Sequence, residues 1–105
     1  MRSLLFAARG IDDKSRLRLG GCDNPAVAFS TARPLARDGA YRLRAYSSSP
    51  ATEQARFVFP HGMRARLVDL AGRRVARRDL KRLSGGAIQL QMRSFEIVTF
   101  EVAAT

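Results

Sequence analysis

The sequence predicts an all-β fold, an antiparallel β-sandwich of about seven strands. From residue 25 onward, apolar and polar residues alternate with a period of two in several short runs. Gly, Pro and Ser separate these runs at spacings of roughly 8–14 residues, and no window of helical length has a 3.6-residue period. The closing segment Met92–Val102 is the most apolar run, and β-branched and aromatic residues dominate it.

Two ranges divide the chain. We expect residues 1–24 to form an irregular lead with at most one short strand, because a charge cluster at 12–16 and turn residues near its end dominate it. Arg16–Leu19 is the candidate for that strand. Residues 25–105 are expected to form the sandwich, and a chain of 105 residues is long enough for one domain.

The first predicted strands lie between residues 26 and 60. Val27 and Phe29 alternate with smaller residues up to Pro34, and a tight turn follows at 37–39. The next strand has an apolar face and a second face that carries Arg42, Arg44 and Tyr46. The third strand ends at Pro60, and its two outward residues are Arg56 and Val58.

The later strands repeat this alternation. Arg64 and Arg66 alternate with apolar residues, and the apolar phase then shifts to Val68. This shift predicts either a β-bulge or a strand that is covered on both faces. A turn, a short segment and a helical turn or loop at 80–83 lead to the next alternating run, which begins at Ile88.

The closing segment is predicted to be one long strand at the centre of its sheet. Its apolar residues point to both faces, and neither Gly nor Pro interrupts it. We therefore expect it to tie the end of the chain into the sheet.

The closing segment also resembles the last strand of the C-terminal β-sandwich domain of glycoside hydrolase family 38, the α-mannosidases. Three more segments are similar to that domain in order and spacing. Ala26–Leu35 with Asp38–Gly39 resembles its opening strand and turn, and Tyr41–Tyr46 resembles its next strand. Ala65–Arg73 resembles the hairpin before its final strands. The resemblance covers most of the chain, from Ala26 to Val102.

This resemblance implies a non-catalytic accessory domain that supports or docks on glycoside hydrolase domains. The implied partner is the catalytic domain or subunit of such an enzyme, and self-association is the alternative. The zinc-binding and nucleophilic residues of the family belong to a separate, larger N-terminal domain, and no position of this chain matches them. We therefore expect no glycosidase activity from this chain by itself.

The charge of the chain is strongly positive. Nineteen basic residues face nine acidic ones, for a net charge of +10, and all but two of the basic residues are arginine. Such a balance fits an anionic partner, but we do not expect nucleic acid, because the basic residues are scattered and no nucleic-acid motif accompanies them. Arginine also suits carboxylates on a partner domain. The predicted docking or ligand face consists of Arg42, Arg44, Tyr46, Arg56, Arg64 and Arg66.

No catalytic, metal or cofactor site is predicted. His61 and Cys22 are the single histidine and cysteine, which is too few for a zinc site of three or four protein ligands. Glu96 and Glu101 are expected to face opposite sides of one strand, so they do not form a catalytic pair. The sequence has neither a nucleophile elbow nor a phosphate loop.

A stand-alone binding module is the second class of function, with either a carbohydrate or an anionic polymer as ligand. Tyr41 and Tyr46 fall on opposite faces of one strand, so at most one is exposed, and Tyr46 is the candidate for stacking on a sugar. Most of the phenylalanines are expected in the core; they are Phe6, Phe29, Phe57, Phe59, Phe95 and Phe100.

The expected location is the cytoplasm. A single cysteine permits no intrachain disulfide, and no stretch approaches the roughly 20 apolar residues of a membrane span. No membrane partner is expected.

Overall fold

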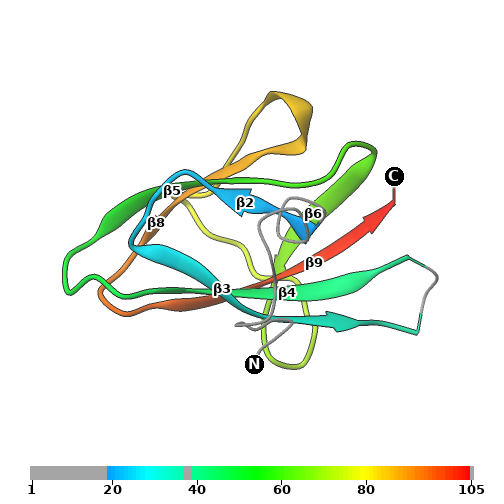
Figure 1. The fold of residues 1–105 in the computed structure, drawn as a ribbon, viewed down its shortest axis with the longest axis horizontal. Coiled ribbons are helices and arrows are strands. Elements are labelled where there is room, and N and C mark those ends of the chain that lie inside the picture. Colours follow the sequence, from blue (N-terminus) through cyan, green and yellow to red (C-terminus); the bar gives the residue numbers. More distant parts are fainter. Residues whose placement is uncertain (1–18, 37–38, 105) are drawn as a thin grey trace.

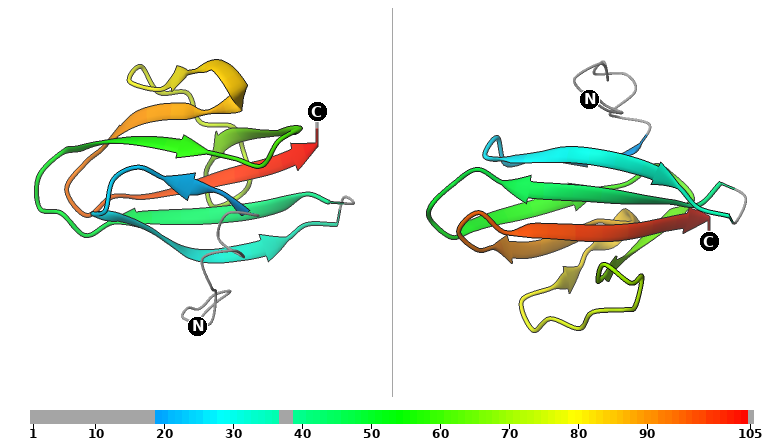
Figure 2. Two further views of the ribbon diagram at one scale, coloured as in Figure 1. Left: turned by 45° about the horizontal axis from the view of Figure 1, so that its top comes forward. Right: turned by 90° about the horizontal axis from the view of Figure 1, so that it is seen from below.

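The computed structural model describes residues 19–36 and 39–104 and shows an antiparallel β-sandwich, which confirms the predicted fold class. Its strands are β2 (Gly21–Cys22), β3 (Val27–Pro34), β4 (Tyr41–Ser47), β5 (Glu53–Val58), β6 (Met63–Val68), β7 (Lys81–Arg82), β8 (Ile88–Met92) and β9 (Ile97–Ala104). They form two four-stranded sheets, in the orders β2-β5-β8-β7 and β3-β4-β9-β6, which we call the β5 sheet and the β9 sheet. The two sheets stack face to face (Figures 1 and 2).

Several predictions fall outside the described residues. These are the charge cluster at 12–16, most of the candidate strand at 16–19, Phe6, and the turn residues Arg37 and Asp38. The short strand β2 does lie in the range predicted as a lead. It pairs with β5 through Gly21↔Val58 and Cys22↔Phe57, so the sandwich begins before residue 25.

The closing strand β9 is central in its sheet, as predicted, because it pairs with β4 on one side and β6 on the other. Val98, Phe100 and Val102 point into the sandwich and are buried. The outward residues Thr99 and Glu101 are also buried, although they lie on the opposite side of the strand.

The prediction of one long strand from Met92 was wrong at its start. Met92 ends β8, and residues 93–96 form a turn between β8 and β9. Glu96 N–H donates to the Arg93 carbonyl oxygen (3.0 Å), and Phe95 adopts a positive φ of 54°. The turn directs Phe95 outward, so its ring is exposed rather than part of the core.

Aromatic rings from both sheets form the centre of the core. The Phe100 ring lies 4.8 Å from Phe57 and 5.3 Å from Phe59, measured between centroids, and Phe29 contacts Phe57 at 6.1 Å. Because Phe57 belongs to the β5 sheet and Phe100 to the β9 sheet, these contacts join the two layers.

Val68 is buried because both faces of β6 are covered there, which was one of the two predicted explanations. The register of β6 against β9 continues without a bulge to Val68↔Thr99. The chain then turns back, so that Val68 bridges to Arg74 and Val75 N–H donates to the Leu67 carbonyl oxygen (2.9 Å). The register of this sheet shifts instead in β3, between Phe29 and Thr31.

The segment predicted as a helical turn or loop contains the short strand β7 and is followed by a 3₁₀ turn at Ser84–Gly86. β7 pairs with β8 and forms one edge of the β5 sheet. The path from β6 to β7 therefore crosses from one sheet to the other, along the yellow segment of Figure 2. No helix among the residues described is long and apolar enough to cross a membrane.

Candidate functional site

The outer face of the β9 sheet collects arginines from three strands. The register aligns Arg33, Arg42, Glu101 and Arg66 across β3, β4, β9 and β6, so these four side chains form one row on the same face. Neighbouring rows on this face hold further arginines. We call the five residues Arg33, Arg42, Arg44, Arg64 and Arg66 the arginine face.

Most of the predicted docking residues do lie together. Arg42, Arg44, Arg64 and Arg66 belong to the arginine face, and Tyr46 lies beside it, opposite Ile97. Arg56 does not: it lies on β5 opposite Gln89, in the other sheet. Alternation along a strand indicates which residues share a side, but it cannot show to which sheet the strand belongs.

The arginine face has more positive than negative charge. Glu101 accepts from Arg66 through Nη2 (2.8 Å) and Nε (3.2 Å), and its side chain is buried. Arg42 and Arg44 each have an Nε atom that is buried without a hydrogen-bond partner. Arg33, Arg64 and Arg66 are exposed, so this face is suited to a ligand or partner that brings acceptor oxygens.

A tight turn at residues 69–73 covers part of this face. Asp69 Oδ1 accepts from the backbone N–H groups of Ala71 and Arg73 (both 2.9 Å). The Arg73 N–H, and to a smaller extent the charges of Arg73 and Arg42, hold the pKa of Asp69 below its usual value. Gly72 has a φ of +83° and lies directly against the Arg42 guanidinium.

Replacing Gly72 with alanine should destabilise the protein by about 2 kcal/mol, because a Cβ would overlap Arg42 Nη2 and the positive φ would be strained. The matched control is Gly85→Ala, since Gly85 has a φ of +75° and no atom within 4 Å of the added Cβ. Urea denaturation of both variants separates strain from overlap. Equal losses of stability would show that Arg42 does not pack firmly against this turn.

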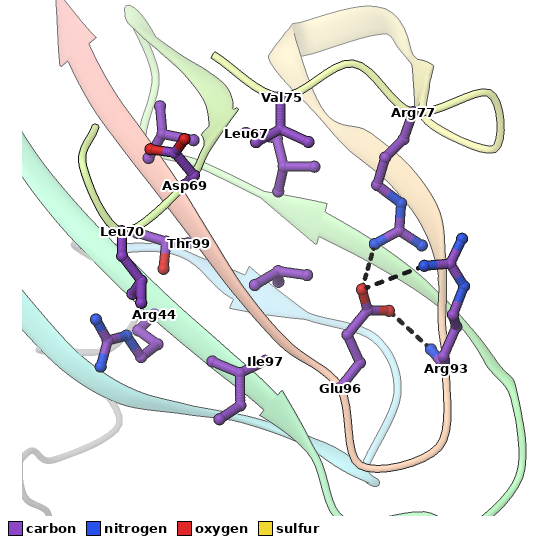
Figure 3. A pocket seen from close by; sticks show the side chains of 12 residues that line it. Arg44, Leu67, Asp69, Leu70, Val75, Arg77, Arg93, Glu96, Ile97 and Thr99 are labelled. Atoms are coloured by element: carbon purple, nitrogen blue, oxygen red, sulfur yellow. Dashed lines mark hydrogen bonds and ion pairs between the residues drawn. The ribbon is translucent and has the colours of Figure 1, made fainter. Parts of the chain in front are cut away.

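An apolar groove of about 570 Å³ lies next to the arginine face. Its apolar lining comes from β6, β9 and the segment after β6, and consists of Leu67, Val68, Leu70, Val75, Ile97 and Val98. Leu70 and Ile97 are 79% and 61% exposed. Figure 3 shows Leu70 and Arg44 at one end of the groove and Glu96 between Arg77 and Arg93 at the other.

The far end of the groove is held by a cluster of charges around Arg77. Its guanidinium donates to both carboxylate oxygens of Asp79 (3.0 and 2.9 Å), to Glu96 Oε2 (2.6 Å) and to the Gln91 carbonyl oxygen (2.8 Å). The hydrogen bond from Arg77 is the main reason that the pKa of Asp79 is below its usual value. Asp79 Oδ2 also accepts from Gln91 N–H (3.1 Å), so the cluster ties the β6–β7 segment to β8 and to the turn before β9.

A second hollow, of about 310 Å³, lies at the edge formed by β6 and β7. Its lining is almost entirely charged and comprises Arg64, Arg66, Arg74, Arg82, Glu101 and Ala103. Sequence reasoning identified Arg64 and Arg66 but not Arg74 and Arg82. No local pattern reveals Arg74 and Arg82, because they come close to Arg64 and Arg66 only where the chain crosses between the sheets.

The remaining candidate residues are separate from these features. His61 is exposed in the turn before β6, and Cys22 is half-buried in β2, where burial raises the pKa of its thiol. Within residues 19–36 and 39–104, no three His, Cys, Asp or Glu side chains lie close enough to hold a metal ion. Tyr41 is half-buried, its hydroxyl donates to the Leu19 carbonyl oxygen (2.7 Å), and burial raises its pKa to about 12.

Tyr46 is the exposed tyrosine of β4, as the alternation predicted.

Comparison with known proteins finds no relative: no protein-family model, curated protein or solved structure matches this chain. The resemblance to the α-mannosidase C-terminal domain therefore stays a prediction.

Proposed function

We propose that this protein is an accessory docking domain that binds an acidic protein surface through the arginine face and the apolar groove beside it. The observation that carries the proposal is the exposed pair Leu70 and Ile97 beside a sheet face on which the five arginines outnumber the carboxylate of Glu101. Carboxylates of a partner would pair with the exposed Arg33, Arg64 and Arg66, and an apolar side chain would fill the groove.

The anatomy of this surface favours a protein over a polyanion. Protein interfaces combine an apolar centre with a polar rim, and arginine is enriched in them. Here Leu70 and Ile97 provide the centre, while Arg44 and Arg93 flank it. A nucleic acid would use the positive charge but would leave the apolar groove empty.

The partner that we propose is the catalytic domain of a glycoside hydrolase, on the basis of the sequence resemblance to family 38. In this role the chain would stabilise its partner or shape the substrate cleft, and it would have no glycosidase activity alone. We further propose that it acts in the cytoplasm.

The experiment mixes this chain with a purified family 38 catalytic chain that lacks its own C-terminal sandwich, and it measures association by size-exclusion chromatography. We expect a complex with the wild-type chain and none with Leu70→Asp, because the variant replaces an apolar contact with a carboxylate that would repel an acidic partner surface. Val58→Asp is the matched control, since Val58 is an exposed apolar residue on the other sheet. No complex with the wild-type chain would remove the proposed partner.

The net charge of +10 favours one alternative, a module that binds an anionic polymer. Its affinity for single-stranded DNA would fall steeply between 50 and 200 mM salt, on the order of 10³-fold for several phosphate contacts. Docking through apolar surface would change little over the same range. The carbohydrate alternative rests on Tyr46, and loss of sugar binding in Tyr46→Ala would support it.

A further inference from the structure

The hollow at the β6–β7 edge brings together arginines from three separate parts of the chain. Arg64 and Arg66 come from β6, Arg74 from the segment that folds back after it, and Arg82 from β7 in the other sheet. Arg82 Nη1 donates to the Ala65 carbonyl oxygen (3.0 Å), which fixes the position of β7 against β6. Four arginines therefore line one hollow of about 310 Å³.

The four positive charges of the hollow exceed the single negative charge of Glu101, which also lines it. Arg66 is paired with Glu101 through Nη2 at 2.8 Å. In the part of the chain that the structure describes, no carboxylate forms an ion pair with Arg64, Arg74 or Arg82. Burial, and then the charges of Arg64 and Arg74, lower the pKa of Arg82, so both of these arginines lie close enough to Arg82 to repel it.

From this geometry we infer that the hollow is a binding site for a tetrahedral dianion of the phosphate or sulfate class. A dianion matches the excess charge better than a single carboxylate does. Guanidinium groups donate two parallel hydrogen bonds to such oxyanions, and several donors around one hollow can reach different oxygens of the same ion. The ion would also relieve the repulsion between β6 and β7. This site does not depend on the docking partner proposed above.

The test titrates the intact chain with inorganic phosphate by isothermal calorimetry at constant ionic strength, with sodium chloride exchanged for phosphate. We expect saturable binding of one ion per chain. Arg74→Gln and Arg64→Gln should each weaken binding by at least about tenfold, since each removes a charge-assisted contact. Both side chains are exposed, and thermal unfolding of each variant confirms that the fold is retained.

Arg56→Gln is the matched control, because it removes one positive charge from the outer face of the other sheet. It should leave the affinity for phosphate unchanged. A parallel titration with phenyl phosphate shows whether the site takes the free ion alone or also a phosphate group carried on a larger molecule.

Two results would overturn the inference. One is a titration without saturation, or one that chloride reproduces at the same ionic strength. The other is an equal loss of affinity for phosphate in Arg56→Gln and Arg74→Gln, because that result would show that phosphate responds only to the net charge of the protein. Either can be obtained whether or not a partner protein docks, so the two proposals fail separately.

Discussion

Replacing Phe100 with alanine is expected to lower the free energy of unfolding by about 4 kcal/mol. Phe100 is fully buried and contacts rings of both β5 and the segment after it, with centroids 4.8 Å from Phe57 and 5.3 Å from Phe59. The truncation removes these contacts and leaves a cavity between the sheets, which rigid strands cannot close. Urea denaturation followed by circular dichroism measures the loss.

Phe95→Ala is the control, because Phe95 is the same residue type with its ring exposed in the turn before β9. We expect it to cost less than about 1 kcal/mol. If Phe100→Ala does not fold, Phe100→Leu keeps most of the volume and should still cost about 1–2 kcal/mol. Equal stability of the Phe100 and Phe95 variants would contradict the packing described for the core.

The second large effect is expected at Arg77, whose side chain is only 9% exposed. Arg77→Leu should destabilise the protein by about 3 kcal/mol, because it leaves Asp79 and Glu96 without their common cation. The carboxylates retain some access to water, which limits the loss. Arg78→Leu removes an exposed neighbouring arginine and should change stability by less than about 0.5 kcal/mol.

The pH dependence gives this prediction a second readout. Arg77 lowers the pKa of Asp79 in the folded protein, so the stabilisation is present above the unfolded pKa of about 3.9 and is lost as the pH falls through the folded value. The difference in stability between wild type and Arg77→Leu should therefore narrow below about pH 4. A difference that stays constant down to pH 2 would show that Arg77 acts through packing and not through its charge.

The sequence was sufficient to predict the fold class, because alternation in short runs separated by turn residues has few other physical explanations. The two faces of β4 are the clearest case: Leu43 and Ala45 are buried, while Arg42, Arg44 and Tyr46 point outward as their spacing requires. The central position of the closing strand also followed from its apolar composition.

Other features depend on how the strands assemble, and no local pattern contains that information. Arg56 has the same alternation as Arg44, yet it faces away from it on the other sheet. Phe95 lies in an apolar run, but the hydrogen bonds of Glu96 with Arg93 form a turn that directs the ring outward. Arg77 pairs with Asp79 only two residues along the chain, whereas its pairing with Glu96, nineteen residues away, required the fold.

The two hollows show the same limit. The apolar groove forms because the segment after β6 folds back over the outer face of β9, and the basic hollow forms because β7 joins the other sheet. Both depend on a crossover between the two sheets. The sequence alone could therefore identify the residues, but it could not show that they lie close together.

The most direct test of the proposed docking measures the dissociation constant of the complex with the glycoside hydrolase catalytic chain for Arg44→Glu and Arg56→Glu. Both variants change the net charge equally, but only Arg44 belongs to the arginine face and lines the groove. The proposal predicts at least about tenfold weaker binding for Arg44→Glu and no more than about twofold for Arg56→Glu. Equal affinities of the two variants would contradict it.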